Sequence, residues 1–181
     1  MCGNLISWIL QSNREMVPIV TIDGPSGSGK GTIAKALALR LNWNYLDSGL
    51  LYRCFAFLHN QDVDNISEAF SRIEHKYDSE SEDILFDGNN ITSIIRGKEI
   101  TVLSSQLSQK SEVREQLMQI QKQYRKLPGL VAEGRDMSSK LFPDSKVKIY
   151  LTADLSERVN RRANQLRNDG QKVNISELKN E

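Results

Sequence analysis

A glycine-rich stretch near the start of the chain constrains its fold more than any other feature. It reads Gly24-Pro25-Ser26-Gly27-Ser28-Gly29-Lys30-Gly31-Thr32, follows the β-prone run from Ile19 to Ile22, and precedes an apolar pattern with helical spacing. In a strand, loop and helix of this kind, backbone N–H groups and the helix N-terminus converge on phosphate oxygens. The sequence therefore predicts a loop that binds ATP, in which Lys30 supplies a mobile positive charge to the β- and γ-phosphates.

The residue after Lys30 departs from the general motif, in which Ser or Thr stands there and its hydroxyl reaches magnesium. Gly31 occupies this position, and Thr32 comes next. We expect Lys-Gly-Thr in small-molecule kinases that phosphorylate nucleotides, rather than in GTPases or motors. Mg²⁺ is then expected to be held by phosphates and water with Thr32 nearby, and no residue is assigned as a metal ligand.

Strand and helix patterns alternate along the chain, which predicts an α/β fold with a parallel sheet flanked by helices. Beyond the loop, we expect a short strand at 43–49, buried strands at 130–136 and 147–152, and helices at 50–60, 111–126 and 156–170. The stretch from His75 to Leu103 differs, because short apolar runs alternate with the turn pairs Asp87-Gly88 and Arg96-Gly97. We interpret it as a small antiparallel β insert over 73–104, with the core over 16–72 and 105–181.

The charge balance argues against a polyanionic partner. Lys plus Arg (24) nearly equals Asp plus Glu (23), so we expect neither nucleic acid nor a membrane surface as a partner. No apolar run approaches the length of a membrane span. Cys2 and Cys54 fit no metal-binding spacing and indicate free thiols in the cytoplasm. Residues 1–15 lack the features of a signal peptide and are interpreted as an extension or a start-site artefact.

Isolated arginines stand beside small polar residues along the chain, and one of them is placed to bind a ligand. Arg135 directly follows a predicted buried strand, at the carboxyl end of the sheet, where α/β proteins bind ligands. A single arginine is otherwise most often a solvated surface charge. The others are Arg53, Arg96, Arg114, Arg158, Arg161 and Arg162.

Several motifs in order resemble those of bacterial cytidylate kinases, the (d)CMP kinases among the P-loop nucleoside monophosphate kinases. The resemblance covers the chain from about Val17 to its end and rests on IDGPSGSGKGT, YLDSGLLYR, SSQLSQKSEVREQL, LPGLVAEGRDM and FPDSKVKIYL. It implies that the insert binds the nucleoside monophosphate and that residues 155–170 form a short lid. Glu133 and Ser138 depart from the family pattern, which has Asp and Gly at these positions.

The resemblance also implies roles for individual residues. Ser48, Arg53 and Arg135 would hold the acceptor phosphate. The cytosine would be read by Ser105, Arg114 and Asp136. A carboxylate suits the N4 amino donor of cytosine and an arginine suits its N3 and O2 acceptors, whereas uracil would present a carbonyl to the carboxylate. The alternative for Arg114 and Asp136 is a salt bridge between helix and loop.

The implied activity is transfer of the γ-phosphoryl group of ATP to CMP or dCMP, by a cytoplasmic monomer that uses Mg²⁺. Lys30 and the lid arginines Arg158, Arg161 and Arg162 would act on the migrating group, and no strong general base is needed. Two alternatives stay open: a kinase for another small phosphate acceptor, and an ATP-binding module without turnover. The family pattern continues beyond VNISELKNE, so we expect a truncated chain with four core strands, an exposed edge beside VKIYL, and lowered stability and activity.

Overall fold

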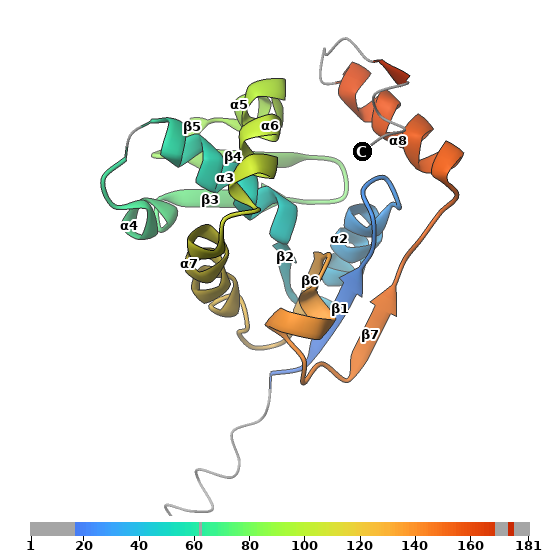
Figure 1. The fold of residues 1–181 in the computed structure, drawn as a ribbon. Coiled ribbons are helices and arrows are strands. Elements are labelled where there is room, and N and C mark those ends of the chain that lie inside the picture. Colours follow the sequence, from blue (N-terminus) through green and yellow to red (C-terminus); the bar gives the residue numbers. More distant parts are fainter. Residues whose placement is uncertain (1–16, 62, 169–173, 176–181) are drawn as a thin grey trace, which may run out of the picture.

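A four-stranded parallel sheet lies at the centre of the computed structural model, which describes residues 17–61, 63–168 and 174–175 (Figure 1). The strands follow the spatial order β2-β6-β1-β7. Each pairs in parallel with its neighbour. The strands are β1 (Ile19–Asp23), β2 (Asn44–Asp47), β6 (Leu130–Gly134) and β7 (Val147–Tyr150). The predicted parallel α/β sheet is thus confirmed.

Two hydrophobic clusters divide the residues of the central strands between them. Val20 and Ile22 of β1 pack with Ala34 and Ala38 of α2 (Lys30–Leu41), the helix that follows the glycine-rich loop. Ile19 belongs to the other cluster, together with residues of α3 (Ser48–Asn60) and α7 (Ser111–Lys122). Successive side chains of a strand point to opposite faces, so helices cover both faces of β1 and β6 and leave these strands wholly buried.

The insert begins as the predicted antiparallel sheet and continues as helices. After α4 (Ile66–Phe70), the strands β3 (Ile73–Tyr77), β4 (Glu82–Phe86) and β5 (Asn89–Asn90) pair antiparallel in sequence order. Asp87 (φ 51°) and Gly88 (φ 77°) both have positive φ, as a two-residue hairpin turn requires. The predicted hairpin at this pair is confirmed.

The second predicted turn of the insert, Arg96-Gly97, is wrong as a hairpin. Gly97 separates α5 (Thr92–Arg96) from α6 (Lys98–Leu107). The buried side chains of Ile95 and Ile100 join the same hydrophobic cluster as α3, and this packing decides the structure of a region whose short apolar runs fit a strand equally well. The predicted domain boundary at 104 falls inside α6, and the division into domains stays a prediction.

The prediction for β7 is right about the strand and wrong about its burial. Val147, Ile149 and Tyr150 are 47%, 38% and 73% exposed. β7 is the last strand in the order and only β1 pairs with it among the described residues, which agrees with the expected four core strands and the exposed edge beside VKIYL. α8 (Leu155–Asn168) follows β7, and its predicted end at Gly170 lies outside the described residues, as do residues 1–15.

A membrane-spanning helix and a metal-binding cluster are both absent from the described residues. None of their helices is long and apolar enough to cross a membrane. They also contain no group of three or more His, Cys, Asp or Glu side chains placed to hold a metal ion. Cys54 is a free, buried cysteine, and burial raises the pKa of its thiol to about 12. Cys2 lies outside the described residues.

Candidate nucleotide-binding site

The glycine-rich loop turns sharply between β1 and α2, directly under α8 (Figure 1). Gly27 has φ 73°, in the left-handed region that favours glycine. A Cβ atom at Gly27 would lie 2.6 Å from the carbonyl oxygen of Arg158 in α8. Glycine at this position therefore allows both the turn of the loop and the close approach of the helix.

Lys30 begins α2 and turns its side chain back over the loop. Its Nζ lies 3.5 Å from the carbonyl oxygen of Pro25 and 3.7 Å from Oε2 of Glu133 at the end of β6. Glu133 is only 5% exposed. Burial raises the pKa of Glu133 to about 8, the negative charge of Asp47 adds to this rise, and the Lys30 cation opposes it. A buried carboxyl and a lysine thus face each other at the mouth of the loop.

Two buried side-chain atoms in the described part of the chain have no hydrogen-bond partner, and both belong to predicted phosphate-binding residues. They are Oγ of Ser28, in the glycine-rich loop, and Nε of Arg53, on α3. A buried polar atom without a partner costs about 1–3 kcal/mol, so such atoms are rare unless a ligand completes them. Their positions fit one anion at the loop and a second at the start of α3.

The start of α3 is built to receive that second anion. Asp47 caps the helix, since its Oδ1 accepts a hydrogen bond of 2.9 Å from the Leu50 N–H. Its Oδ2 lies 3.7 Å from Nη2 of Arg53. Ser48, the first residue of the helix, is 6% exposed. Ser48 therefore lies at a helix N-terminus, where backbone N–H groups favour negative charge, and Arg53 lies between one and two turns further along α3.

A cavity of about 320 Å³ lies between α3, α7 and the helical turn Met137–Leu141 (η1). It brings together three residues that the sequence predicted for acceptor binding, Ser48, Arg114 and Asp136. Sequence reasoning missed the rest of its lining: Tyr52, Ser111, Glu115, Met118, Gln121, Met137, Lys140 and Leu141. Apart from their positions beside predicted residues, no signal in the sequence marked them.

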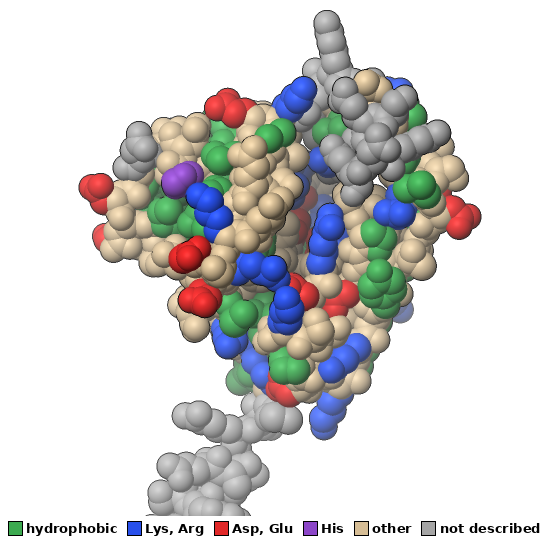
Figure 2. All heavy atoms as spheres, viewed as in Figure 1, with side chains coloured by type: hydrophobic (Ala, Val, Ile, Leu, Met, Phe, Trp, Pro, Cys, Tyr) green, Lys and Arg blue, Asp and Glu red, His purple; other side chains and the backbone are tan. Residues whose placement is uncertain are grey.

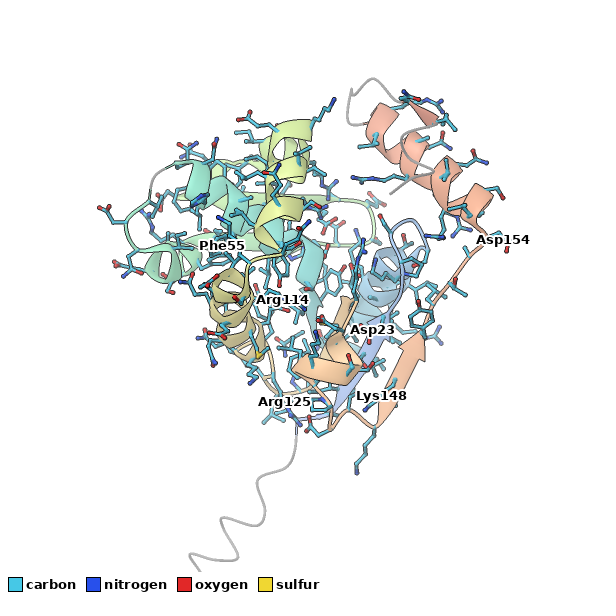
Figure 3. The ribbon with its side chains drawn as sticks, viewed as in Figure 1. Asp23, Phe55, Arg114, Arg125, Lys148 and Asp154 are labelled. Atoms are coloured by element: carbon cyan, nitrogen blue, oxygen red, sulfur yellow. The ribbon has the colours of Figure 1, made fainter. Side chains whose placement is uncertain are left out.

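Arg114 and Asp136 face each other in this cavity. Nη2 of Arg114 donates a hydrogen bond of 2.8 Å to Oδ2 of Asp136, and Nζ of Lys140 lies 3.7 Å from the same oxygen. The salt bridge between helix and loop is therefore present. Figure 3 shows Arg114 on α7, on the side of the helix toward the sheet.

Asp23, at the carboxyl end of β1, holds the segment that carries Asp136 (Figure 3). Its carboxylate accepts hydrogen bonds from the Met137 N–H (2.8 Å), the Ser138 N–H (2.9 Å) and the Ser138 hydroxyl (2.6 Å). Asp23 is 4% exposed, so these charge-assisted bonds are shielded from water. Sequence reasoning missed this role, and the departure at Ser138 was the one available signal.

Three predicted acceptor residues do not line the cavity: Arg53, which lies on α3, and two exposed residues. Arg135 is exposed immediately after β6, and Ser105 is exposed on α6. The Ser105 carbonyl oxygen accepts a hydrogen bond of 2.7 Å from the hydroxyl of Ser108, within the same helix end. The structure thus brings four of the six predicted acceptor residues to α3 and the cavity wall and leaves these two outside it.

The predicted lid helix contacts the donor loop through a hydrogen bond from Arg161, beside the close approach of the Arg158 backbone to Gly27. Nη1 of Arg161 donates a hydrogen bond of 3.2 Å to the carbonyl oxygen of Ser28, while its Nε donates to Oε1 of Glu157 at 2.7 Å. Nε of Arg158 donates to the Ala153 carbonyl oxygen at 3.1 Å. Arg162 is half-buried on the same helix. Figure 2 shows Lys and Arg side chains gathered along a hollow in this face of the molecule.

Comparisons with known proteins identify the family of this chain. The family model described as "Cytidylate kinase" matches residues 20–181. Among curated relatives, the "Cytidylate kinase" of Stutzerimonas stutzeri is 45% identical over 172 residues, which cover 90% of this chain and 75% of the relative. The proteins of the same name from Pseudomonas fluorescens and Colwellia psychrerythraea are 42% and 40% identical, over 93% and 91% of this chain and 78% and 77% of theirs. The chain belongs to the cytidylate kinase family.

Proposed function

We propose that this chain transfers the γ-phosphoryl group of ATP to CMP or dCMP, giving ADP and CDP or dCDP. The observation that carries the proposal is the pair of Arg114 and Asp136 in the cavity beside α3. A carboxylate has lone pairs for several donors, and a guanidinium has five N–H groups. The two side chains can keep their mutual bond and still accept from N4 and donate to N3 of cytosine, so the salt bridge does not oppose base recognition.

The donor would lie on the glycine-rich loop, with its phosphates on the backbone N–H groups from Gly24 to Thr32. The unpartnered hydroxyl of Ser28 supports this position. Lys30 lies at the mouth of the loop, and we propose that it moves from Glu133 to the β- and γ-phosphates when ATP binds.

Mg²⁺ would accompany the donor and supply positive charge to its phosphate oxygens. The described residues fit an ion held mainly by phosphates and water, because they contain no cluster of three metal-ligating side chains. Thr32, exposed on the first turn of α2, is the first hydroxyl after the lysine in the sequence.

The acceptor phosphate would lie at the start of α3, against Ser48 and Arg53. The buried and unpartnered Nε of Arg53 supports this assignment. Arg135 and Ser105 are exposed, and we propose that they reach the acceptor from the rim, on its phosphate and its base respectively. The acceptor phosphate oxygen is already largely anionic near neutral pH, so alignment and positive charge carry the reaction without a general base.

The lid arginines Arg158, Arg161 and Arg162 would complete the site around the migrating phosphoryl group. The bond from Arg161 to the Ser28 carbonyl oxygen supports this role, because it places α8 on the donor loop itself. Closure of the lid would exclude water, which would otherwise accept the phosphoryl group. We also propose that the chain acts in the cytoplasm and as a monomer. The monomer is supported because one chain supplies the described parts of both nucleotide sites.

The test is phosphoryl transfer from Mg-ATP to CMP, dCMP, UMP and AMP, with Lys30→Ala as the blank. We expect turnover of CMP and dCMP well above that of UMP and AMP. A preference for AMP or UMP would overturn the roles of Arg114 and Asp136 and favour a kinase for another acceptor. ATP binding without turnover of any acceptor would identify a nucleotide-binding module instead.

A further inference from the structure

Gln121 is a buried polar residue in the wall of the acceptor cavity. It is 4% exposed and lines the cavity together with Arg114 and Asp136. Within the described part of the chain, its side-chain amide forms no hydrogen bond. Neither amide atom is one of the fully buried, unpaired side-chain atoms of the described residues, so the amide is open to the space of the cavity.

The position of Gln121 on α7 follows from the spacing of the residues that line the cavity. Ser111, Arg114, Met118 and Gln121 recur at intervals of three, four and three residues, which places them on one face of the helix. Arg114 lies toward the start of this face, and its side chain is 42% exposed. Gln121 lies about 10 Å further along the helix axis, at the buried end of the same face.

Packing alone does not explain an amide at this position. Leu117 precedes it in the helix with no exposure, and Leu141, 7% exposed, lines the same cavity. A leucine or methionine would fill such a site equally well, whereas an amide open to the cavity needs water or a ligand as its hydrogen-bond partner. A carboxamide that faces a cavity is instead explained by a polar molecule that enters the cavity and completes its hydrogen bonds.

We propose that Gln121 binds the pyrimidine ring of the acceptor monophosphate from the inner end of the cavity. This inference rests on the proposed function and adds a residue to its acceptor site. A carboxamide offers both donors and an acceptor, so it can pair with cytosine or with uracil. Gln121 therefore contributes affinity for the ring, while Asp136 distinguishes the bases.

The test compares Gln121→Met with Gln119→Met, a substitution of the same type at an exposed position of the same helix. We expect Gln121→Met to raise the Kd and the KM for CMP about tenfold, the effect of one lost hydrogen bond to a ligand. The KM for ATP should stay within about twofold of the unaltered value. The ratio of CMP to UMP turnover should not change, because the amide serves both bases.

The melting temperature without ligand separates a binding role from a structural one. Because the amide forms no hydrogen bond with the described residues, its replacement should leave the melting temperature of Gln121→Met equal to that of the unaltered chain, or raise it. A lowered melting temperature with an unchanged Kd for CMP would overturn the inference. So would equal effects of Gln121→Met and Gln119→Met on CMP binding.

Equilibrium binding of CMP also separates this inference from the proposed function. If the unaltered chain binds CMP but transfers no phosphoryl group, the proposed function fails while the effect of Gln121→Met on Kd still decides the inference. If Kd is unaffected in an active enzyme, the inference alone fails. If the unaltered chain binds no CMP, both fail.

Discussion

The donor loop and the acceptor cavity of this protein are built in different ways. The loop is one continuous segment, from Gly24 to Thr32, and its phosphate-binding groups are mostly backbone N–H groups. The cavity is assembled from side chains of α3, α7 and η1, which are far apart in the sequence. A backbone site is fixed by local conformation, whereas an assembled site depends on how distant elements are held together.

The two sites also share a support. Asp23 ends the strand that leads into the donor loop, and its carboxylate holds the backbone of η1 in the acceptor cavity. The contrast between a local and an assembled site therefore predicts different consequences for substitutions in the loop, in the support and in the cavity wall.

The largest expected effect is on the donor side. Lys30→Ala should lower kcat by about 10²–10³-fold, since it removes a positive charge directed at the developing negative charge of the transition state. Turnover at saturating CMP measures this loss, and circular dichroism checks that the fold is retained. Lys35→Ala, on the same helix, is the control and should keep kcat within about twofold because Lys35 pairs only distantly with Glu82, at 4.0 Å. Equal losses in both variants would contradict a special role for Lys30.

The next effect should appear in the support between the two sites. Asp23→Ala removes the acceptor of two backbone N–H groups and one hydroxyl, all buried or partly buried. We expect the free energy of unfolding to fall by about 3 kcal/mol and the KM for CMP to rise, because η1 loses its anchor. Urea denaturation and initial rates measure the two quantities. Ser138→Ala loses only the hydroxyl bond and should cost about 1 kcal/mol; an Asp23→Ala chain with unchanged stability would show that η1 is held by other contacts.

A smaller and more specific effect is expected in the cavity wall. Asp136→Asn replaces a carboxylate with an amide that can donate to O4 of uracil, so the ratio of kcat/KM for CMP to that for UMP should fall about tenfold or more. Competition between the two substrates measures the ratio directly. Lys140→Met is the matched control, because it removes the cation 3.7 Å from Asp136 and leaves the carboxylate in place. An unchanged ratio in Asp136→Asn would place base recognition elsewhere.

The smallest effect concerns pH and the carboxyl at the mouth of the loop. Folding raises the pKa of Glu133 from 4.5 to about 8, so the folded chain binds a proton more tightly than the unfolded chain. The free energy of unfolding should therefore fall as pH rises between these two values. In Glu133→Gln this fall should be weaker, as denaturation at pH 5, 6, 7 and 8 would reveal.

Glu82, whose pKa is lowered to about 2 chiefly by its hydrogen bond with His75, stays ionised in that range and does not produce the slope. Parallel pH profiles for the two chains would exclude Glu133 as the titrating group.

Local sequence signals predicted the local parts of this structure. The glycine pattern gave the loop and the helix after it, and Asp87-Gly88 gave the hairpin of the insert, since both depend on conformations that few residues adopt. The family pattern predicted an exposed edge beside VKIYL, whereas the apolar residues of β7 alone predicted a buried strand, because a central strand and an edge strand can have the same composition.

The assembled parts were only partly predictable. Arg114 and Asp136 were recognised from motifs in a family pattern, and the structure places them 2.8 Å apart. Gln121 lies outside the quoted motifs and Asp23 lies inside that of the glycine-rich loop, but the roles of both depend on contacts with segments that fold against them from elsewhere in the chain. Pattern reasoning within short windows cannot show such contacts, and it also could not separate helix from strand at Ile95 and Ile100.

The hydrogen bonds of Asp23 have a consequence for engineering the protein. Any attempt to change the acceptor by grafting the segment from Arg135 to Leu141 from another kinase has to preserve two N–H groups that point at one carboxylate. A graft whose backbone enters at another angle leaves a buried negative charge on the strand that leads into the ATP loop. Redesign of substrate choice is therefore expected to succeed when β1 and η1 are exchanged together as one module.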